Sequence, residues 1–441
     1  MINKNDILDV DIIDMGCNLE GIAKVDGVVL FVPYAIVGER VKVQVISTKQ
    51  RAYIAKVLQV LKPSPFRTTP KCPYFGKCGG CQTQHINYSE QLKLKTNMVD
   101  NAIKNIAKLD AAVSTCVPCD NEYAYRNKLA FPINPITKKV GMFRTNSHNI
   151  VDISNCEIQE KWASDLIEII NSYISTYDVS VFSETQNSGL LKHIVARAFN
   201  GQYLFTVVIN GNNLPYANNL VEMLSSKFDN FGLNININTI NNNVIMTNNF
   251  KHIYGLQKIS CSEYGVNYEI TNASFMQVNN NIKHKIYDAV LNEINGGVVV
   301  DAYSGAGLLS AIVSKKADKV FGIEIVKPAV DSANKLTLEN NIPNLKNICG
   351  DTAIELPNLV KQIGTNFSLI LDPPRKGCDA KVLNTILKSK PQKIVYVSCN
   401  PSTLARDLGV LKENYNILSI TPFDMFPETC HVETLAVLQL R

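Results

Sequence analysis

From Ala273 onward the chain alternates short apolar runs with amphipathic segments, and this alternation constrains the fold more than any other feature. The apolar runs Val298–Val300, Val320–Ile323, Ser368–Leu371 and Ile394–Val397 have the length and composition of buried strands. Buried strands that alternate with helices are typical of a doubly wound, mainly parallel sheet. Such sheets bind ligands beyond the carboxyl ends of their strands, so we expect functional residues directly after these runs.

A glycine-rich loop follows the first of these runs. This loop, Ala302–Gly307, leads into an apolar helix, and its glycines would let the backbone approach a cofactor at the helix N-terminus. The second run leads to Glu324, an acid placed to hold ribose hydroxyls. Asp351, which follows a further strand before the run Ser368–Leu371, could lie near an adenine amine. Ser310 stands where a dinucleotide site has its third glycine, which favours a mononucleotide-like cofactor over NAD.

Three later residues carry chemistry at the ends of strands. Asp372 opens an Asp-Pro-Pro-Arg sequence, whose paired prolines predict a rigid, extended loop. Cys399 follows a buried run and precedes Asn-Pro and a helix, whose N-terminal N–H groups would favour a thiolate. A lone cysteine is more often a small buried hydrophobe, and Glu433, just before the last strand, is by default a solvated acid. Their neighbours must therefore decide their roles.

The chain also contains a Cys-x5-Cys-x2-Cys array made of Cys72, Cys78 and Cys81. Two glycines between the last two cysteines would let the backbone curl around a ligand. An uneven triplet with a distant fourth cysteine suits an iron–sulfur cluster better than zinc, which usually takes two Cys-x2-Cys pairs. The fourth ligand could be Cys156 or one of the pair Cys116 and Cys119.

The N-terminal region predicts a small barrel with a basic surface. Residues 7–61 alternate short β-type runs with turn signals, which favours a closed barrel of OB type. From Arg40 to Ser89 the chain holds nine basic residues and no acid, although the whole chain has 39 acids. This imbalance favours a polyanion-binding surface over a merely solvated face. Tyr34 and Tyr53 could stack bases there, or could simply pack in the core.

Cysteine content and hydropathy indicate the compartment. The 441 residues include 12 cysteines, and no apolar leader or run of membrane-spanning length is present. Because no secretory signal is found, the cysteines are expected to bind metal or take part in catalysis rather than to form disulfides. We therefore expect a cytoplasmic protein of two or three domains with no membrane contact and no obligate protein partner.

Together these residues resemble the RNA uracil-C5 methyltransferases, and in form most closely the bacterial 23S rRNA enzymes with a TRAM domain and an iron–sulfur cluster. The resemblance covers nearly the whole chain and is carried by four patterns: Ser274–Asn279, Asp372–Arg375, Ser398–Pro401 and His431–Glu433. It implies an α/β protein with three parts: a TRAM/OB-type RNA-binding barrel (1–62), a central α+β domain with the cluster loop (63–265) and a Rossmann-like, S-adenosylmethionine-dependent methyltransferase domain (266–441). The helix near 90–112 could pack on the last part.

The resemblance also implies roles for individual residues. S-adenosylmethionine and the target base would be bound by Gln277, Tyr303, Glu324, Asp351 and Asp372. Cys399 would be the nucleophile and Glu433 the base. A [4Fe-4S] cluster would be held by Cys72, Cys78, Cys81 and Cys156, which selects Cys156 as the fourth ligand. Leu308 stands where some relatives have a polar residue, so no cofactor contact is expected there.

The implied reaction is methyl transfer from S-adenosylmethionine to C5 of a specific uridine in RNA, through a covalent bond between Cys399 and uracil C6. The expected substrate is 23S rRNA, because the tRNA enzymes commonly lack both barrel and cluster; tRNA is the alternative. Three other functions compete. An amino-group methyltransferase would need no thiol, an RNA-binding iron–sulfur protein would need no S-adenosylmethionine, and a cluster-dependent oxidoreductase is disfavoured by the missing dinucleotide glycine.

Overall fold

The computed structural model describes residues 2–48 and 53–441, and the chain divides into two compact units. Unit 1 comprises Met1–Glu122, Pro373–Leu383 and Val395–Arg441, and unit 2 comprises Tyr123–Asp372 and Asn384–Ile394. Within the described ranges, no helix is both long enough and apolar enough to cross a membrane.

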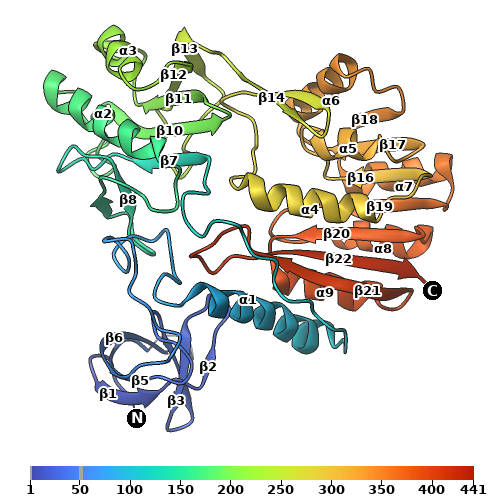
Figure 1. Ribbon diagram of the computed structural model, residues 1–441, viewed down its shortest axis with the longest axis horizontal. Coiled ribbons are helices and arrows are strands. Elements are labelled where there is room, and N and C mark those ends of the chain that lie inside the picture. The colour runs from blue at the N-terminus through green and yellow to red at the C-terminus, as the bar shows by residue number, and fades with distance from the viewer. Residues whose placement is uncertain (1, 49–52) are drawn as a thin grey trace. The chain divides into compact units, whose positions relative to one another are not determined.

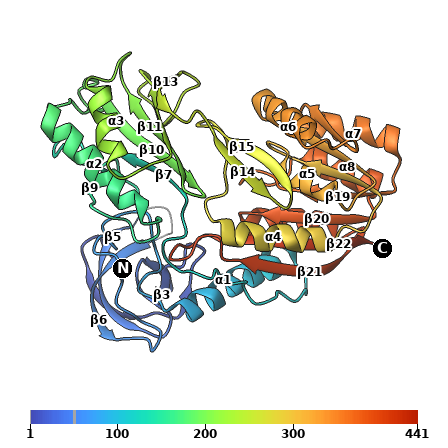
Figure 2. The same cartoon turned by 45° about the horizontal axis from the view of Figure 1, so that its top comes forward.

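Unit 1 begins with six strands that curl into the predicted barrel (Figures 1 and 2). In spatial order the sheet reads β1-β5-β6-β4-β3-β2. The strands are β1 (Ile7–Asp11), β2 (Asp14–Met15), β3 (Gly21–Val25), β4 (Val28–Val32), β5 (Arg40–Ser47) and β6 (Tyr53–Lys62). Along β5, Val41, Val43 and Val45 are fully buried while the residues between them are partly exposed, the alternation expected of a sheet with one face in a core.

The two barrel tyrosines that could stack bases have packing partners in the structure. Tyr53 packs against the barrel core, and the ring of Tyr34 meets Phe75 edge to face, with the ring centroids 5.2 Å apart. Among the nine basic residues, Arg67 is paired with the buried carboxylate of Glu39, and Lys49 and Arg51 lie outside the described residues. Five others are exposed: Arg40, Lys56, Lys62, Lys71 and Lys77.

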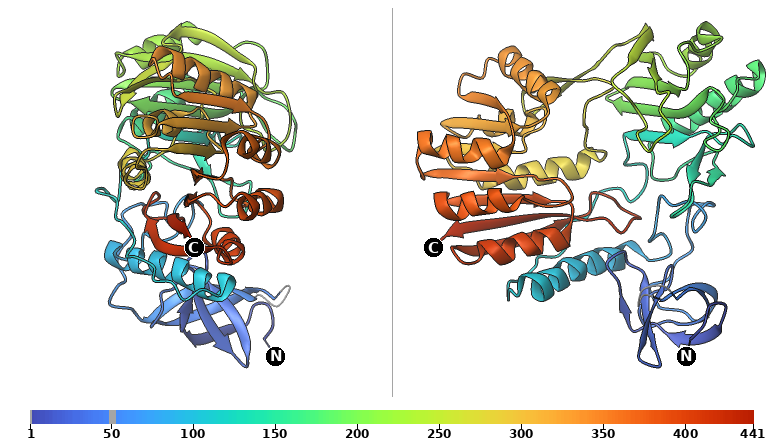
Figure 3. Two further views of the ribbon diagram at one scale, coloured as in Figure 1. Left: turned by 90° about the vertical axis from the view of Figure 1, so that its right-hand side faces the viewer. Right: turned by 180° about the vertical axis from the view of Figure 1, so that it is seen from behind.

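The predicted helix after the cysteine array is present as α1 (Tyr88–Ala102), which continues into a π-helical turn, η1 (Ile103–Ala107). It begins where Asn87 accepts a hydrogen bond from the N–H of Glu90, satisfying a donor that no helical partner could reach. Its buried face includes Leu94, Lys95 and Val99. In Figures 1 and 3 helix α1 lies beside two later elements of unit 1, α9 (Pro401–Leu411) and β21 (Tyr415–Phe423).

Unit 2 begins with a five-stranded sheet in the order β13-β12-β11-β10-β7, with two helices packed together beside it (Figure 2). Its strands are β7 (Lys128–Pro132), β10 (Leu191–Phe199), β11 (Gln202–Ile209), β12 (Phe231–Ile237) and β13 (Phe250–Gly255), and its helices are α2 (Trp162–Tyr177) and α3 (Ala217–Ser225). The two small ladders are β8 (Gly141–Phe143) with β9 (Ile150–Asp152), and β14 (Ile259–Glu263) with β15 (Val266–Ile270).

The C-terminal part of the chain forms the predicted doubly wound sheet. Its order is β18-β17-β16-β19-β20-β22-β21, and the first four of these strands are mutually parallel. The strands are β16 (Val298–Ala302), β17 (Lys319–Glu324), β18 (Leu345–Cys349), β19 (Phe367–Leu371), β20 (Lys393–Ser398), β21 and β22 (Glu433–Leu440). The helices are α4 (Asn280–Asn292), α5 (Leu308–Val313), α6 (Lys327–Glu339), α7 (Thr352–Ile363), α8 (Ala380–Ser389) and α9. The expected α/β fold class is therefore confirmed.

Candidate active site

In unit 2, four parallel strands bring predicted cofactor residues to one edge of the sheet. Ala302 is in register with Ile323 on one side and with Leu371 on the other, and Glu324 is in register with Cys349. The predicted cofactor residues stand at these strand ends or within two residues after them: Tyr303, Glu324, Asp351 and Asp372. They therefore line the carboxyl edge of β16, β17, β18 and β19, where an open parallel sheet binds its ligands.

The glycine-rich loop is tied to the neighbouring strand by backbone hydrogen bonds. The N–H groups of Tyr303 and Ser304 both donate to the carbonyl of Ile323, and the N–H of Gly305 donates to the Glu324 carboxylate at 3.0 Å. Tyr303 has φ of 70°, a left-handed conformation that a bulky residue adopts only where its surroundings enforce it. The loop and Glu324 thus form one rigid element.

Glu324 and Asp351 also have local structural roles that the sequence did not reveal. The second oxygen of the Glu324 carboxylate accepts the N–H of Val326 at 2.7 Å, and Asp351 caps helix α7 by accepting the N–H of Ala353 at 2.9 Å. A carboxylate has about four lone-pair sites, so one or two such bonds leave acceptor capacity for hydroxyl or amine groups of a ligand.

Asp301, beneath the loop, was missed by sequence reasoning. It is 1% exposed and accepts a hydrogen bond from the Ser310 hydroxyl at 2.5 Å, so the serine at the third glycine position has a structural partner. Burial, reinforced by the nearby charges of Asp372 and Glu324, raises the pKa of the Asp301 carboxyl to about 7. The signal in the sequence was an acid at the end of an otherwise apolar strand.

Asp372 differs from Asp301 because a ligand can reach it. The residue is exposed, yet surrounding protein desolvates its carboxyl enough to raise the pKa to about 6. A carboxylate in this situation is stabilised by any ligand that donates hydrogen bonds or brings positive charge. The position and the electrostatics of Asp372 therefore agree with a role in ligand binding.

Gln277 lies in the segment between β15 and α4, which buried polar side chains hold in place. The Asn127 side chain donates to the carbonyl of Gln277 at 3.2 Å, and the guanidinium of Arg197 donates to the carbonyls of Asn272 and Ser274. Arg197 is 2% exposed, and this burial lowers the pKa of its guanidinium to about 10. Sequence reasoning missed both holding residues.

In unit 1, Cys399 lies between the end of β20 and the start of α9 and is half-buried. The next residue, Asn400, caps α9 by accepting the N–H of Ser402 at 3.0 Å. Its side-chain amide also donates to the carbonyl of Arg375, which the Thr403 hydroxyl contacts as well. The loop after the two prolines is thereby fastened beside the cysteine, as the strand–turn–helix pattern predicted.

A single carboxylate, that of Asp407, fixes the surroundings of Cys399. It is fully buried in α9 and accepts hydrogen bonds from the Tyr396 hydroxyl at 2.6 Å and from the N–H of Cys378 at 2.9 Å. Its neighbour Arg406 donates to the carbonyls of Lys376 and Cys378. These hydrogen bonds fasten strand β20, helix α9 and the loop at Gly377 to one another.

Glu433 is the first residue of β22 and is 7% exposed, so it is not the solvated acid that a lone glutamate suggests. Strand β22 is antiparallel to β21, with Glu433 opposite Phe423. Because a helical crossover joins β20 to β21, these two strands run in the same direction, and β22 opposes both (Figure 1). The start of β22 therefore lies at the edge where β20 ends, which is the Cys399 edge.

The cysteine loop of unit 1 has half-buried thiols at Cys72, Cys78 and Cys81. The N–H of Gly80 donates to the sulfur of Cys78 at 3.3 Å, and burial, with the nearby Cys72, raises the Cys78 pKa. Cys156 belongs to unit 2 and is also half-buried. Among the described residues, no three or more His, Cys, Asp or Glu side chains are arranged to hold a metal ion, so the predicted cluster is not confirmed.

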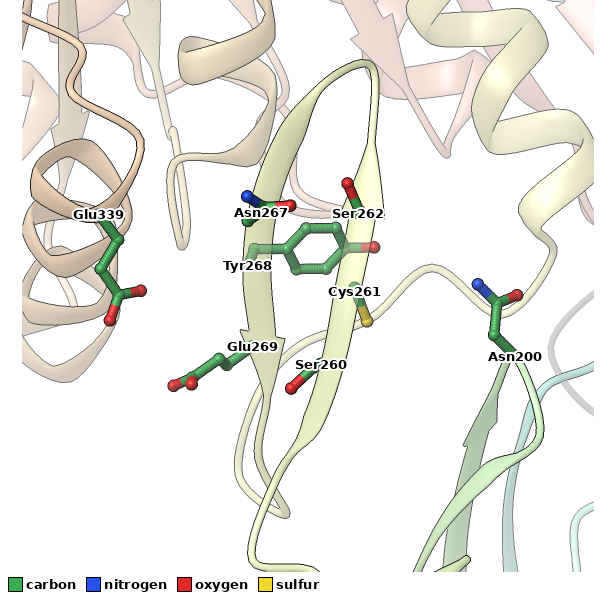
Figure 4. Close-up of a pocket in the computed structure, with 8 residues that line it drawn as sticks. All are labelled: Asn200, Ser260, Cys261, Ser262, Asn267, Tyr268, Glu269 and Glu339. Atoms are coloured by element: carbon green, nitrogen blue, oxygen red, sulfur yellow. The ribbon is translucent and has the colours of Figure 1, made fainter.

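The structure also contains a pocket of about 510 Å³ on the β14–β15 hairpin of unit 2 (Figure 4). None of the residues predicted for the site lines it. The lining residues are Asn200, Ser260, Cys261, Ser262, Asn267, Tyr268, Glu269 and Glu339. Burial raises the pKa of Cys261 to about 12, so its thiol is a poor nucleophile. This pocket is separate from the strand ends described above.

Known proteins share this architecture over the whole chain. The crystal structure of the Pyrococcus abyssi tRNA (uracil-54, C5)-methyltransferase in complex with S-adenosyl-L-homocysteine matches with a TM-score of 0.79 and 27% identity, covering 98% of this chain and 99% of that one. RNA methyltransferases named as uncharacterized are 37% identical in Clostridium tetani (99% of this chain, 97% of the relative) and in Caldanaerobacter subterraneus (98% and 97%). The fold is that of S-adenosylmethionine-dependent methyltransferases.

Two family models give the finer assignment. The model of the tRNA (uracil-5-)-methyltransferases matches residues 87–441, and the model of the TRAM domain matches residues 3–58. The chain therefore belongs to the tRNA (uracil-5-)-methyltransferase family, and the enzyme is an S-adenosylmethionine-dependent RNA (uracil-C5)-methyltransferase. The predicted family, enzyme class, S-adenosylmethionine as cofactor and RNA as partner are confirmed. The predicted [4Fe-4S] cluster, the 23S rRNA substrate and the roles of individual residues stay predictions.

The glycine-rich loop yields a direct test. Gly307 has φ of +80°, and a Cβ there would lie 2.7 Å from the Cβ of Ala333, so Gly307→Ala both strains the backbone and displaces α6. We expect roughly tenfold weaker S-adenosylmethionine binding by isothermal titration, because about 1–2 kcal/mol of left-handed strain is added to the clash in the binding loop.

Gly364→Ala is the matched control, since Gly364 has φ of +76° with no atom within 4 Å of the added Cβ. Its ψ of −162° places it in a region that only glycine adopts readily, so Gly364→Ala should lower the melting temperature through a backbone strain of its own while leaving the binding constant unchanged. Equal affinity in the Gly307→Ala variant and the wild type would contradict a role for this loop in cofactor binding.

Proposed function

We propose that this enzyme methylates C5 of a specific uridine through a covalent bond between the sulfur of Cys399 and C6 of the base. The observation that carries the proposal is the position of Cys399 and Glu433 at one edge of the sheet in unit 1, at the end of β20 and the start of β22. A nucleophile and a base are the two groups that this reaction requires from the protein.

The nucleophile is needed because C5 of uracil does not attack a methyl sulfonium unaided. Addition of the Cys399 thiolate forms the S–C6 bond and moves the electrons of the C5=C6 bond into an enolate. S-adenosylmethionine, when bound, would supply the methyl group that C5 of this enolate takes, and would leave as S-adenosylhomocysteine once its S–CH3 bond is broken. Hydrogen-bond donors near the enolate oxygen would lower the barrier. Gln277, through its amide, and Tyr303, through its phenol, are the neutral donors among the predicted pocket residues.

The base completes the reaction. After methylation C5 carries both a methyl group and a proton, and Glu433 takes that proton. The electrons of the C–H bond re-form C5=C6, the S–C6 bond breaks, and Cys399 leaves as a thiolate. The buried position of Glu433 suits this step, because desolvation makes a carboxylate a stronger base. The uridine must leave its stack to reach these groups.

The proposed substrate is 23S rRNA, and tRNA is the second candidate. The prediction of rRNA depended on the presence of the barrel and the cysteine loop. The solved enzyme from Pyrococcus abyssi is named for uracil-54 of tRNA and covers 98% of this chain, so an N-terminal barrel does not distinguish the two substrates. The exposed basic residues of the barrel would bind the backbone of either RNA.

The function is tested by methyl transfer from labelled S-adenosylmethionine to unmodified 23S rRNA and to tRNA, followed by nucleoside analysis and site mapping. We expect 5-methyluridine in 23S rRNA; its appearance only in tRNA would keep the mechanism and change the substrate.

Cys399→Ala should lower the rate of methyl transfer by on the order of 10³-fold or more, because the nucleophile is lost. Cys17→Ala, which removes an exposed cysteine of the barrel, should have no effect. Methylated adenine or guanine would exclude Cys399 as the nucleophile.

A second prediction separates the base from the nucleophile. In Glu433→Gln the thiolate can still add and the methyl group can still be transferred, but the C5 proton stays in place. The enzyme should accumulate as a covalent protein–RNA adduct, visible as a shifted band on a denaturing gel. Glu413→Gln, at an exposed glutamate of the same unit, should turn over normally. A Glu433→Gln enzyme that turns over freely without adduct would remove Glu433 from the role of base.

We also infer that Cys72, Cys78, Cys81 and Cys156 bind a [4Fe-4S] cluster. What supports this is the spacing of the triplet together with three half-buried thiols in one loop, one of which already accepts a backbone N–H. Such N–H···S bonds stabilise the charge of a cysteine-bound cluster. The cluster has no redox step in the reaction above, so we assign it a structural or RNA-positioning role.

Protein purified without oxygen should contain iron and acid-labile sulfide in matching amounts. Cys78→Ser should lose both, because one thiolate ligand is removed, while Cys349→Ser, at an exposed cysteine, should retain both. Wild-type protein free of iron and sulfide would rule out the cluster. A Cys78→Ser variant with full activity and unchanged RNA affinity would rule out the role assigned to it.

A further inference from the structure

The side-chain amide of Gln82 connects two parts of unit 1 that are far apart in the sequence. Its nitrogen donates to the carbonyl of Gly79, inside the cysteine loop, at 2.9 Å. Its oxygen accepts the N–H of Cys430, three residues before Glu433, at 3.4 Å. Gln82 directly follows Cys81, so a change in the cysteine loop displaces this amide.

Further hydrogen bonds hold the segment 424–433, which ends at Glu433 and is here called the base-bearing segment, against the start of α1 and the residues before it. The carbonyl of Glu428 accepts the N–H groups of both Gln82 and Thr83, at 3.1 and 3.2 Å. The Gln91 side chain accepts the N–H of Glu428 at 3.2 Å and donates to its carboxyl group at 3.1 Å. The backbone and side chain of Glu428 are thus bonded to residues 82–91.

A buried ion pair anchors the beginning of the same segment. The ammonium of Lys95 lies 2.5 Å from the carboxylate of Asp424 and 3.1 Å from the carbonyl of Phe426, and both charged side chains are fully buried. Replacing a buried ion pair with apolar residues is often neutral or stabilising, so such a pair is weak support for stability. In this structure the ion pair instead fixes the position at which the base-bearing segment starts.

The base-bearing segment needs this support because its backbone is strained. Glu428 has φ of 67°, a left-handed conformation that a glutamate avoids unless its surroundings hold it, and it is only 1% exposed. Without its partners in residues 82–91, Glu428 would relax toward ordinary backbone angles. Cys430 and Glu433, which follow it in the chain, would then shift.

We propose that Gln82 is a positioning residue through which the cysteine loop holds the base-bearing segment, and with it Glu433, in register for removal of the C5 proton. The inference rests on the proposed function, because it takes Glu433 as the base. It assigns the cysteine loop to the last step of the reaction. Addition of Cys399 and methyl transfer precede that step and do not require Glu433.

The test compares Gln82→Leu with the wild type in two measurements on the same RNA. The rate of the first methyl transfer, in a single turnover, should stay within about twofold of wild type. Release of methylated RNA should slow by about tenfold, and the covalent adduct should accumulate. A general loss of stability would reduce both rates together, so the split between them reports positioning.

Gln202→Leu is the matched control. Gln202 uses its amide in the same way, donating to the carbonyl of Ser260 at 3.0 Å and accepting its N–H at 3.2 Å, but lies in unit 2 away from the base-bearing segment. It should change neither rate. Product release at the wild-type rate in Gln82→Leu, or an equal adduct in Gln202→Leu, would overturn the inference.

RNA that carries 5-fluorouridine at the target separates this inference from the proposed function. Fluorine at C5 cannot be removed as a proton, so wild-type enzyme should be trapped as an adduct whatever Gln82 does. If the wild type forms no such adduct, the covalent mechanism itself fails. If it forms one while Gln82→Leu releases normal RNA as fast as wild type, only the positioning role fails.

A double-mutant cycle tests the link to the cysteine loop. If the loop acts through Gln82, Cys78→Ser should slow release in the wild-type background and add little in Gln82→Leu. Equal slowing in both backgrounds, or none in either, would show that the loop does not act through this amide.

Discussion

The catalytic part of unit 1 depends on the hydrogen bonds that the buried carboxylate of Asp407 accepts. One side chain accepts hydrogen bonds from strand β20, through Tyr396, and from the loop after the two prolines, through Cys378. A fully buried carboxylate is costly to leave unpaired, so these partners are not easily exchanged. Cys399, between β20 and α9, is held in place by this arrangement.

Much of the fold and part of the site could be predicted because each signal was local. Apolar runs marked the strands, and the residues after them, such as Glu324 and Cys399, were marked by position alone. Asp301 with Ser310, and Asp407 with Tyr396, could not be paired in advance, because only the packing of the sheet decides which polar side chains meet. Asp351 shows the opposite difficulty: a pattern interpreted as ligand binding also serves to cap α7.

The cysteine loop shows where residue spacing no longer suffices. Spacing identified three candidate ligands, yet the contacts that give the loop a mechanistic meaning come from the next residue, Gln82, whose partner Cys430 is 348 positions away. A glutamine after a cysteine motif is unremarkable in a sequence. Its role depends on long-range pairing, which no periodicity or composition encodes.

These long-range contacts also bear on how the chain folds during synthesis. Lys95 and Asp424 are separated by 329 residues, so the ion pair that α1 finally buries cannot form until more than 300 further residues have been made. Closing a loop ten times longer adds only about 2 kcal/mol of entropy, so the delay is one of time rather than of stability. Helix α1 is among the first helices to leave the ribosome and among the last to reach its final surroundings.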